Sequence, residues 1–236
     1  MSEHMSLEEI YRHSVTFPGP HMPLFGLRTA LKAVEEELAH ASDQATVRLQ
    51  VRHNQRANCI HPDDRDLDLH ELEVTVRHTL PRVFRGGFVL TLWSVFEVVA
   101  KRMAEYVCRE RRLPTVQSKF RHNFLVSLDK VYADLTIVAF PDPAIREQLD
   151  QLRHIRNALI HRNGSVAALP ESMRVRAPDS YATLGLQTYE DLHDEFFVPT
   201  ADFLTRNFSL VEMYLTTLSE RVYAAVHPMP IEETRS

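Results

Sequence analysis

The stretch PDPAIREQLDQLRHIRNALIHRNG, residues 141–164, sets the fold class. Its apolar side chains recur at steps of four, three, three and four residues, which is the spacing of one buried face of an α-helix: Ile145, Leu149, Leu152, Ile155 and Leu159. Asp142 suits the N-cap with Pro143 in the first turn, and Asn163-Gly164 suits the C-terminal stop. We therefore predict a helix between these signals, with one face in a core.

The same periodicity extends over much of the chain, which contains only six glycines. It predicts long helices over Pro23–Arg52, Val83–Arg109 and Thr200–Val226, and a further helix within Ser118–Phe140. We expect an all-α fold, an up-and-down helical bundle with an additional N-terminal helix and loop. The expected division is a helical extension over 1–80 packing on the core, a helical domain over 81–228 and a tail over 229–236.

Three segments interrupt this pattern. His53–Leu69, with HPDDRDLD at its centre, lacks a period and is expected to be an acidic loop. Leu69–Leu80 is ambiguous between helix and strand, and Pro81 indicates a helix boundary. Ser165–Val198 is expected to be irregular, and the sequence also allows a short hairpin near MRVRA, residues 173–177.

Composition excludes several classes of protein. Two cysteines in unrelated contexts suggest neither a disulfide framework nor a CxxC metal site, which fits a reducing cytoplasm. No secretory signal is visible at the N-terminus, and the near-apolar run Phe88–Ala100 is too short to span a bilayer, so we expect no membrane association. A net charge of −5 argues against binding nucleic acid over the whole surface but allows a local basic site.

Arg156 is unusual because it falls inside the apolar stripe of residues 145–159. An arginine stays charged, so it needs an anion or a water-filled cleft there. Glu97, the only carboxylate in FVLTLWSVFEVVA, is the predicted partner. The simpler alternative is a structural ion pair that holds two helices in register. Asn157 and His161 share a neighbouring face, and His154 lies on that side.

The spacing of an arginine five residues before a histidine is not specific, since it occurs four times: Arg48/His53, Arg56/His61, Arg65/His70 and Arg156/His161. The last pair differs in context, because it ends a capped amphipathic helix and has an asparagine directly after the arginine.

The string IRNALIHRNG resembles the signature of the HEPN superfamily, in which an arginine and a polar residue are followed by apolar residues and a histidine. LPRVFRGGFVLTLWSVFE is similar to the HEPN segment that carries an acidic residue, here Glu97, and the resemblance spans roughly Leu80–Ala225. It implies a HEPN-like helical bundle, commonly dimeric with two motifs facing across a cleft. Many such proteins are metal-independent endoribonucleases of toxin–antitoxin, antiphage or RNA-processing systems, and others have lost catalysis.

The resemblance implies a catalytic set of Arg156, Asn157, His161 and Glu97, with RNA contacts from Arg153, His154 and Arg162. Histidine suits proton transfer near neutral pH, and arginine suits the phosphate oxygens. No metal or other cofactor is expected. The expected partners are RNA, a second copy of the chain and an antitoxin or regulatory protein. Two alternatives stay open: a non-catalytic HEPN module that binds RNA, nucleotide or protein, and a helical structural subunit in which Arg156 is architectural.

Other candidate sites are weaker. The acidic and histidine residues of 61–70 lack the spacing of calcium loops and zinc proteases, so a solvated loop is favoured. Arg109, Arg111 and Arg112 suit RNA contact, but equally an ordinary charged helix end. Cys108 lacks a clear partner histidine for nucleophilic catalysis.

Overall fold

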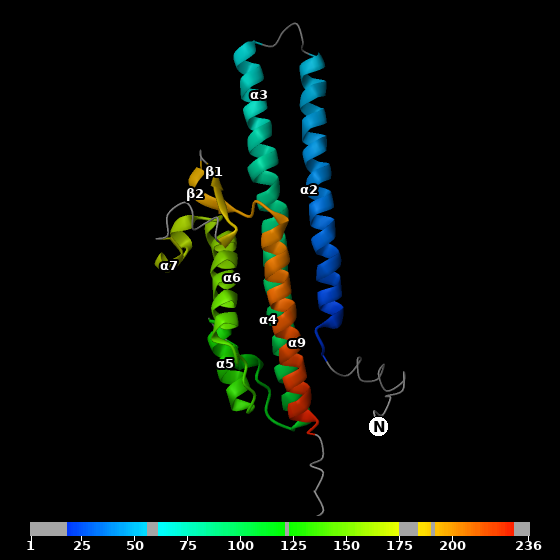
Figure 1. Ribbon diagram of the computed structural model, residues 1–236, viewed down its shortest axis with the longest axis vertical. Coiled ribbons are helices and arrows are strands. Elements are labelled where there is room, and N and C mark those ends of the chain that lie inside the picture. The colour runs from blue at the N-terminus through cyan, green and yellow to red at the C-terminus, as the bar shows by residue number, and fades with distance from the viewer. Residues whose placement is uncertain (1–17, 56–60, 121–122, 175–183, 190–191, 229–236) are drawn as a thin grey trace, which may run out of the picture. The chain divides into compact units, whose positions relative to one another are not determined.

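The computed structural model describes residues 18–55, 61–120, 123–174, 184–189 and 192–228, and these are mostly helical (Figure 1). The elements in chain order are α2 (His21–Gln55), α3 (Pro62–Val74), a π-helical turn (Thr75–Thr79), α4 (Leu80–Glu110), a 3-10 turn (Gln117–Lys119), α5 (Phe124–Asp134), α6 (Pro143–Arg162), a 3-10 turn (Val166–Ala168), α7 (Glu171–Arg174), β1 (Gln187–Tyr189), β2 (Leu192–Phe197) and α9 (Ala201–Val226). The all-α expectation is confirmed at this level, with one antiparallel hairpin added.

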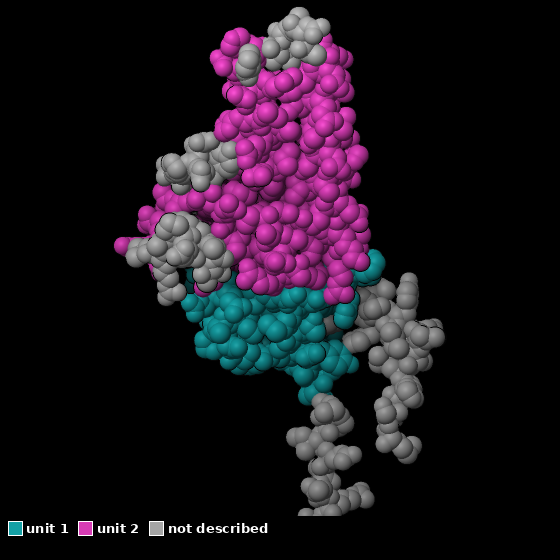
Figure 2. Space-filling view, turned by 45° about the horizontal axis from the view of Figure 1, so that its top comes forward, with its two compact units in different colours: residues 1–25, 94–150, 209–236 teal, residues 26–93, 151–208 magenta. Residues whose placement is uncertain are grey.

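The chain forms two compact units, coloured separately in Figure 2. Unit 1 consists of residues 1–25, 94–150 and 209–236, and unit 2 consists of residues 26–93 and 151–208. Helices α2, α4, α6 and α9 each contribute to both units. The predicted domain boundary at residue 80 stays a prediction, and the predicted tail 229–236 lies outside the described residues.

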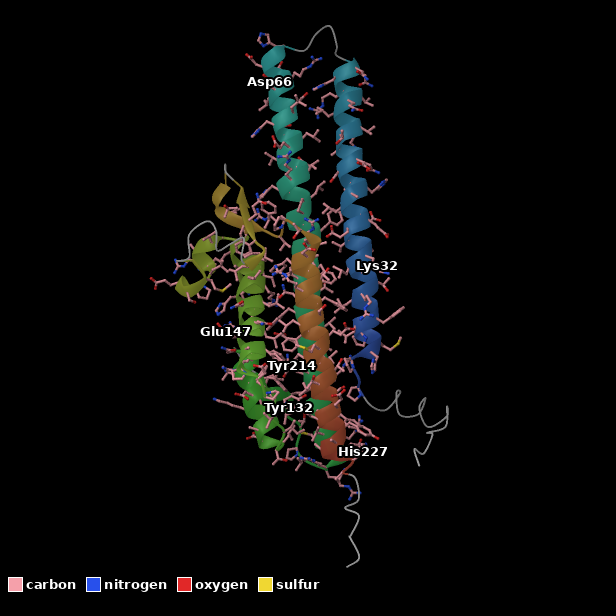
Figure 3. The ribbon with its side chains drawn as sticks, viewed as in Figure 1. Lys32, Asp66, Tyr132, Glu147, Tyr214 and His227 are labelled. Atoms are coloured by element: carbon pink, nitrogen blue, oxygen red, sulfur yellow. The ribbon has the colours of Figure 1, made fainter. Side chains whose placement is uncertain are left out.

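Unit 1 is built around aromatic side chains. Phe96 contacts Phe124 and Tyr214 edge-on, with ring centroids 5.4 and 5.5 Å apart. The Tyr132 hydroxyl donates to the Ala100 carbonyl at 2.8 Å, so its buried polar atom is satisfied. Both tyrosines are labelled in Figure 3. Burial raises the pKa of each well above its ordinary value, so both stay neutral across the physiological range.

In unit 2 the acidic segment is a helix, so the predicted loop over His53–Leu69 is wrong at residues 53–55, which end α2, and from residue 62 onward, while residues 56–60 lie outside the described residues. The physical reason is a good helix N-terminus: the His61 side chain accepts from the Asp63 amide, and Pro62 begins the first turn. Asp63 and Asp64 then lie at the positive end of the helix dipole. Asp68 faces α2, where it accepts from Arg52 at 2.7 Å and His53 at 3.0 Å, so α3 runs beside α2 (Figure 1).

Pro81 does not end a helix, contrary to the prediction, and the ambiguous Leu69–Leu80 is helical throughout. The π-helical turn Thr75–Thr79 precedes it, with the Leu80 amide bonded to the Thr75 carbonyl. Proline lacks an amide hydrogen and crowds the preceding turn, and a widened turn relieves both problems. Residues 63–110 therefore form one continuous helix.

This helix, Asp63–Glu110, is the one described segment long and apolar enough to cross a membrane by length and composition. A core helix of a soluble protein passes the same test, and 44% of the most apolar window is buried inside the protein. Phe88, Leu92, Trp93 and Phe96 are among its buried side chains. Its length alone therefore does not indicate a membrane span.

The segment after α6 contains a hairpin, but not where the sequence suggested. Met173 and Arg174 belong to the short helix α7, and the remainder of MRVRA lies outside the described residues. The strands observed are β1 and β2, paired antiparallel with Gln187 opposite Phe197 and Thr188 opposite Phe196. Their register shifts between Thr188 and Tyr189.

Gly164 ends α6 in a conformation that favours glycine, with φ of 77°. A Cβ there would lie 2.7 Å from the Phe196 carbonyl oxygen, which is backbone and cannot swing away. We expect Gly164→Ala to lower the free energy of unfolding by about 2 kcal/mol, measured by urea denaturation. The matched control is Gly87→Ala within α4, where a Cβ meets nothing within 4 Å and helix propensity favours alanine by about 0.5–1 kcal/mol. Equal effects of the two substitutions would contradict this account.

Candidate functional site

Helix α6 carries most of the predicted site, and its predicted limits are confirmed. The Asp142 carboxylate accepts from the Ala144 amide at 2.8 Å, which caps the N-terminus. Leu149, Leu152 and Ile155 are almost fully buried, as the stripe predicted. The helix ends at Arg162, followed by Asn163 and Gly164 with positive φ.

Arg156 is partly buried, and its guanidinium is bent toward the next residue. Its Nη1 donates to Asn157 Oδ1 at 2.8 Å. Around the axis of an ideal helix, the positions of Arg156 and His161 are separated by an angle of about 140°. The positions of Asn157 and His161 are separated by only about 40°. The hydrogen bond therefore draws the arginine charge toward the side of α6 on which His161 lies.

The Nε atom of Arg156 is buried and has no hydrogen-bond partner among the described residues. A buried donor without a partner is costly, so an acceptor brought within its reach would be stabilising. His161 is exposed and belongs to the last turn of α6. The arrangement combines a fixed cation and an accessible imidazole on one helix.

The three predicted RNA contacts also lie on α6. Arg162 is exposed, and Arg153 and His154 are partly buried. Arg153 Nη2 lies 2.7 Å from His154 Nε2. Because arginine only donates, His154 Nε2 is the acceptor of this hydrogen bond.

Glu97 belongs to α4 and to unit 1, and its carboxylate lies 3.9 Å from Lys101 Nζ, one helical turn away. Its side chain is 28% exposed, so the carboxylate keeps contact with water. The pairing of Glu97 with Arg156 stays a prediction.

A cluster that the sequence did not reveal holds the end of α6. Arg82 of α4 donates to the Glu195 carboxylate and to the Asn163 carbonyl. Asn163 Nδ2 donates to the other Glu195 oxygen at 3.1 Å, and the Phe196 amide donates to the Gly164 carbonyl at 2.8 Å. We call Arg82, Asn163 and Glu195 the α6 clamp. It satisfies the Asn163 carbonyl directly after the helix end, and it fixes the turn that follows His161.

His78 is buried beside this clamp, 2% exposed, with its ring edge-on to Phe197 at a centroid distance of 5.1 Å. Burial lowers its pKa from 6.5, the positive charge of Arg82 lowers it further, and Glu195 opposes the shift. A lowered folded-state pKa means that the unfolded chain binds the proton more readily. The stability contributed by neutral His78 is complete above pH 6.5 and is lost as pH falls toward the folded pKa.

We therefore expect the stability difference between the wild type and His78→Gln to shrink as pH is lowered from about 7 to 5, because only the wild type bears the cost of protonating this buried ring. Urea denaturation at several pH values measures it. NMR titration of the ring gives an independent check, and a His78 pKa at or above 6.5 would contradict the prediction.

The weaker candidate sites are the acidic segment of residues 61–70, the arginines within residues 109–112 and Cys108. In the part of the chain that the structure describes, no group of three or more His, Cys, Asp or Glu is arranged to hold a metal ion. Arg111 donates to the carbonyls of Leu135 and Ala225, so it caps helix ends in unit 1. Cys108 is buried, and burial raises the pKa of its thiol, which disfavours a nucleophilic thiolate.

Comparison of the chain with protein-family models, with curated proteins and with solved structures gave no match.

Proposed function

We propose that this protein is a metal-independent endoribonuclease that cleaves RNA through attack of a 2′-hydroxyl on the adjacent phosphate. The observation that carries the proposal is the Arg156–Asn157 hydrogen bond, which aims a partly buried guanidinium toward the side of α6 that bears the exposed His161. The resemblance of IRNALIHRNG to the HEPN signature supports the same reaction.

The reaction needs a base, an acid and a positive charge from the protein. A base removes the 2′-hydroxyl proton, the 2′-oxygen then bonds to phosphorus, and the bond to the 5′-oxygen breaks as that oxygen gains a proton. Histidine suits either proton transfer. Arg156 would neutralise the charge that develops on the phosphate oxygens, and its directed N–H groups suit that geometry. Asn157 would orient the guanidinium and contact the same phosphate.

A single His161 supplies one proton-transfer group. A homodimer that brings two copies of α6 together would supply both the acid and the base, so we propose a dimer as the active form. Arg153, His154 and Arg162 would contact the RNA backbone. The proposed setting is the cytoplasm, as a toxin or antiphage effector controlled by an antitoxin or regulatory protein.

The test incubates the purified protein with mixed RNA in EDTA and analyses the new ends. We expect cleavage to persist without divalent metal ions and to leave 2′,3′-cyclic phosphate and 5′-hydroxyl ends. Cleavage abolished by EDTA and restored by a divalent metal would refute the mechanism. RNA binding without cleavage would instead identify a non-catalytic binding module.

Arg156→Ala separates catalysis from architecture. Under the proposal, this variant loses cleavage and binds RNA more weakly, because the guanidinium contacts phosphate. Unchanged RNA affinity together with a large fall in the urea midpoint would show that Arg156 is structural.

A further inference from the structure

Unit 2 contains a cavity of about 760 Å³ to which α6 contributes none of the lining residues described. Its walls come from α2, from α3 and the π-helical turn, from the start of α4 and from the β1–β2 hairpin. Sites for organic ligands commonly measure about 300–1,000 Å³, so the cavity has the size of a ligand site.

One guanidinium in this cavity, that of Arg77, has N–H groups left for a ligand, because the Arg85 guanidinium already donates to Glu35 and to the carbonyls of Val198 and Pro199. Arg77 and Arg85 both line the cavity, and arginine only donates. The carboxylate of the wall, Glu73, already accepts from Arg77 at 2.9 Å, and the Arg77 side chain is 74% exposed. Gln187 and Thr188 of β1 add an amide and a hydroxyl. The ligand group that matches these donors is one that only accepts hydrogen bonds, such as a carboxylate, sulfonate or phosphate.

The rest of the cavity wall is largely apolar. Leu38, Val76, Pro81, Phe197 and Pro199 line the same cavity. Arg85 is held in place by both oxygens of Glu35, at 2.7 and 2.8 Å, so its part of the wall is rigid. Val76 and Arg77 belong to the π-helical turn, a feature often found at functional sites.

We propose that this cavity binds a small organic anion with an apolar body, and that the bound anion acts on the end of α6. The anionic group would face Arg77 and the β1 side chains. The apolar body would lie against Phe197 and the two prolines.

A direct path joins the cavity to α6 within unit 2. Phe197 forms part of the wall of the cavity. The residue before it on β2, Phe196, donates its amide hydrogen to the Gly164 carbonyl. The residue before that is Glu195, which belongs to the α6 clamp. A ligand that shifts Phe197 would therefore be expected to shift the two residues that bond to the turn after His161. This second half rests on the proposed function, since only an active His161 gives the shift a catalytic consequence.

The binding test uses two fluorescent probes with the same apolar body. 1-Anilinonaphthalene-8-sulfonate carries a sulfonate, and N-phenyl-1-naphthylamine does not. We expect the full-length wild type to bind the anionic probe more tightly. Arg77→Gln should weaken the anionic probe about fivefold or more and leave the neutral probe unchanged, because one charged hydrogen bond is lost.

Two further variants locate the probe. Ser42→Phe fills the cavity from α2 and should abolish the tight binding. Arg65→Gln, an exposed arginine of α3 that does not line the cavity, should change nothing, and circular dichroism confirms that each variant is folded. Equal binding of the two probes, or anionic binding that survives both Arg77→Gln and Ser42→Phe, would overturn the proposed site.

The coupling is measured on the same protein by NMR and by RNA cleavage. Binding should shift the amide signals of Asn163, Gly164 and Phe196 and change the cleavage rate. Binding without shifts at these amides would overturn the coupling. Shifts in a protein that never cleaves RNA would support the cavity and the path while refuting the proposed function.

Discussion

Under the proposed function, His161→Ala is expected to lower the rate of RNA cleavage by about 10²- to 10⁴-fold, because it would remove a proton-transfer group from the reaction. The side chain is exposed and lies in the last turn of α6, so the urea midpoint should stay close to that of the wild type. RNA affinity should change little, since the loss affects the chemical step. Cleavage is followed with a labelled RNA under single-turnover conditions.

The matched control is His40→Ala, which removes another exposed histidine, on α2. It should retain wild-type cleavage. If His161→Ala cleaves as fast as His40→Ala, the assignment of proton transfer to His161 is wrong. If both variants lose cleavage and stability together, the loss reflects folding.

Arg85→Ala is expected to give the largest loss of stability, about 3 kcal/mol in the free energy of unfolding. The Arg85 side chain is 11% exposed and binds both oxygens of Glu35, and it also donates to the carbonyls of Val198 and Pro199. Alanine leaves a partly buried carboxylate and two carbonyls without these donors. Urea denaturation followed by circular dichroism measures the change.

Arg77→Ala is the comparison for this effect. Arg77 pairs with Glu73 one helical turn away, and both side chains are largely exposed, so its loss should cost under about 0.5 kcal/mol. A similar cost for the two arginines would mean that the buried Arg85–Glu35 pair contributes no more than a surface pair.

The sequence predicted the elements whose signals are local. Apolar periodicity and standard caps were sufficient for α6, and periodicity alone located α2 and α9. The error at α3 arose because its apolar side chains are few and half-exposed, so no stripe marked the helix, although His61 and Pro62 began it well. The π-helical turn before Pro81 could not be predicted, because the sequence signal for proline is a boundary.

The candidate site also has one part that the sequence predicted and one part that it did not. Arg156, Asn157 and His161 were predicted from the resemblance of IRNALIHRNG to the HEPN signature, and helical geometry then related them because they share one helix. The α6 clamp was missed because Arg82 and Glu195 are 113 residues apart, and neither lies in a pattern that marks it. Long-range contacts of this kind depend on tertiary packing, which one sequence does not reveal.

The interleaving of the two units also affects the order in which the protein matures during synthesis. Unit 2 ends at residue 208 and unit 1 takes its final segment from 209–236, so neither can be completed early in translation. His161 is synthesised 34 residues before Glu195, whose carboxylate holds the turn after it. A nascent chain stalled between these positions would carry His161 without the carboxylate that holds the following turn, so under the proposed function the site would stay incomplete until Glu195 is made.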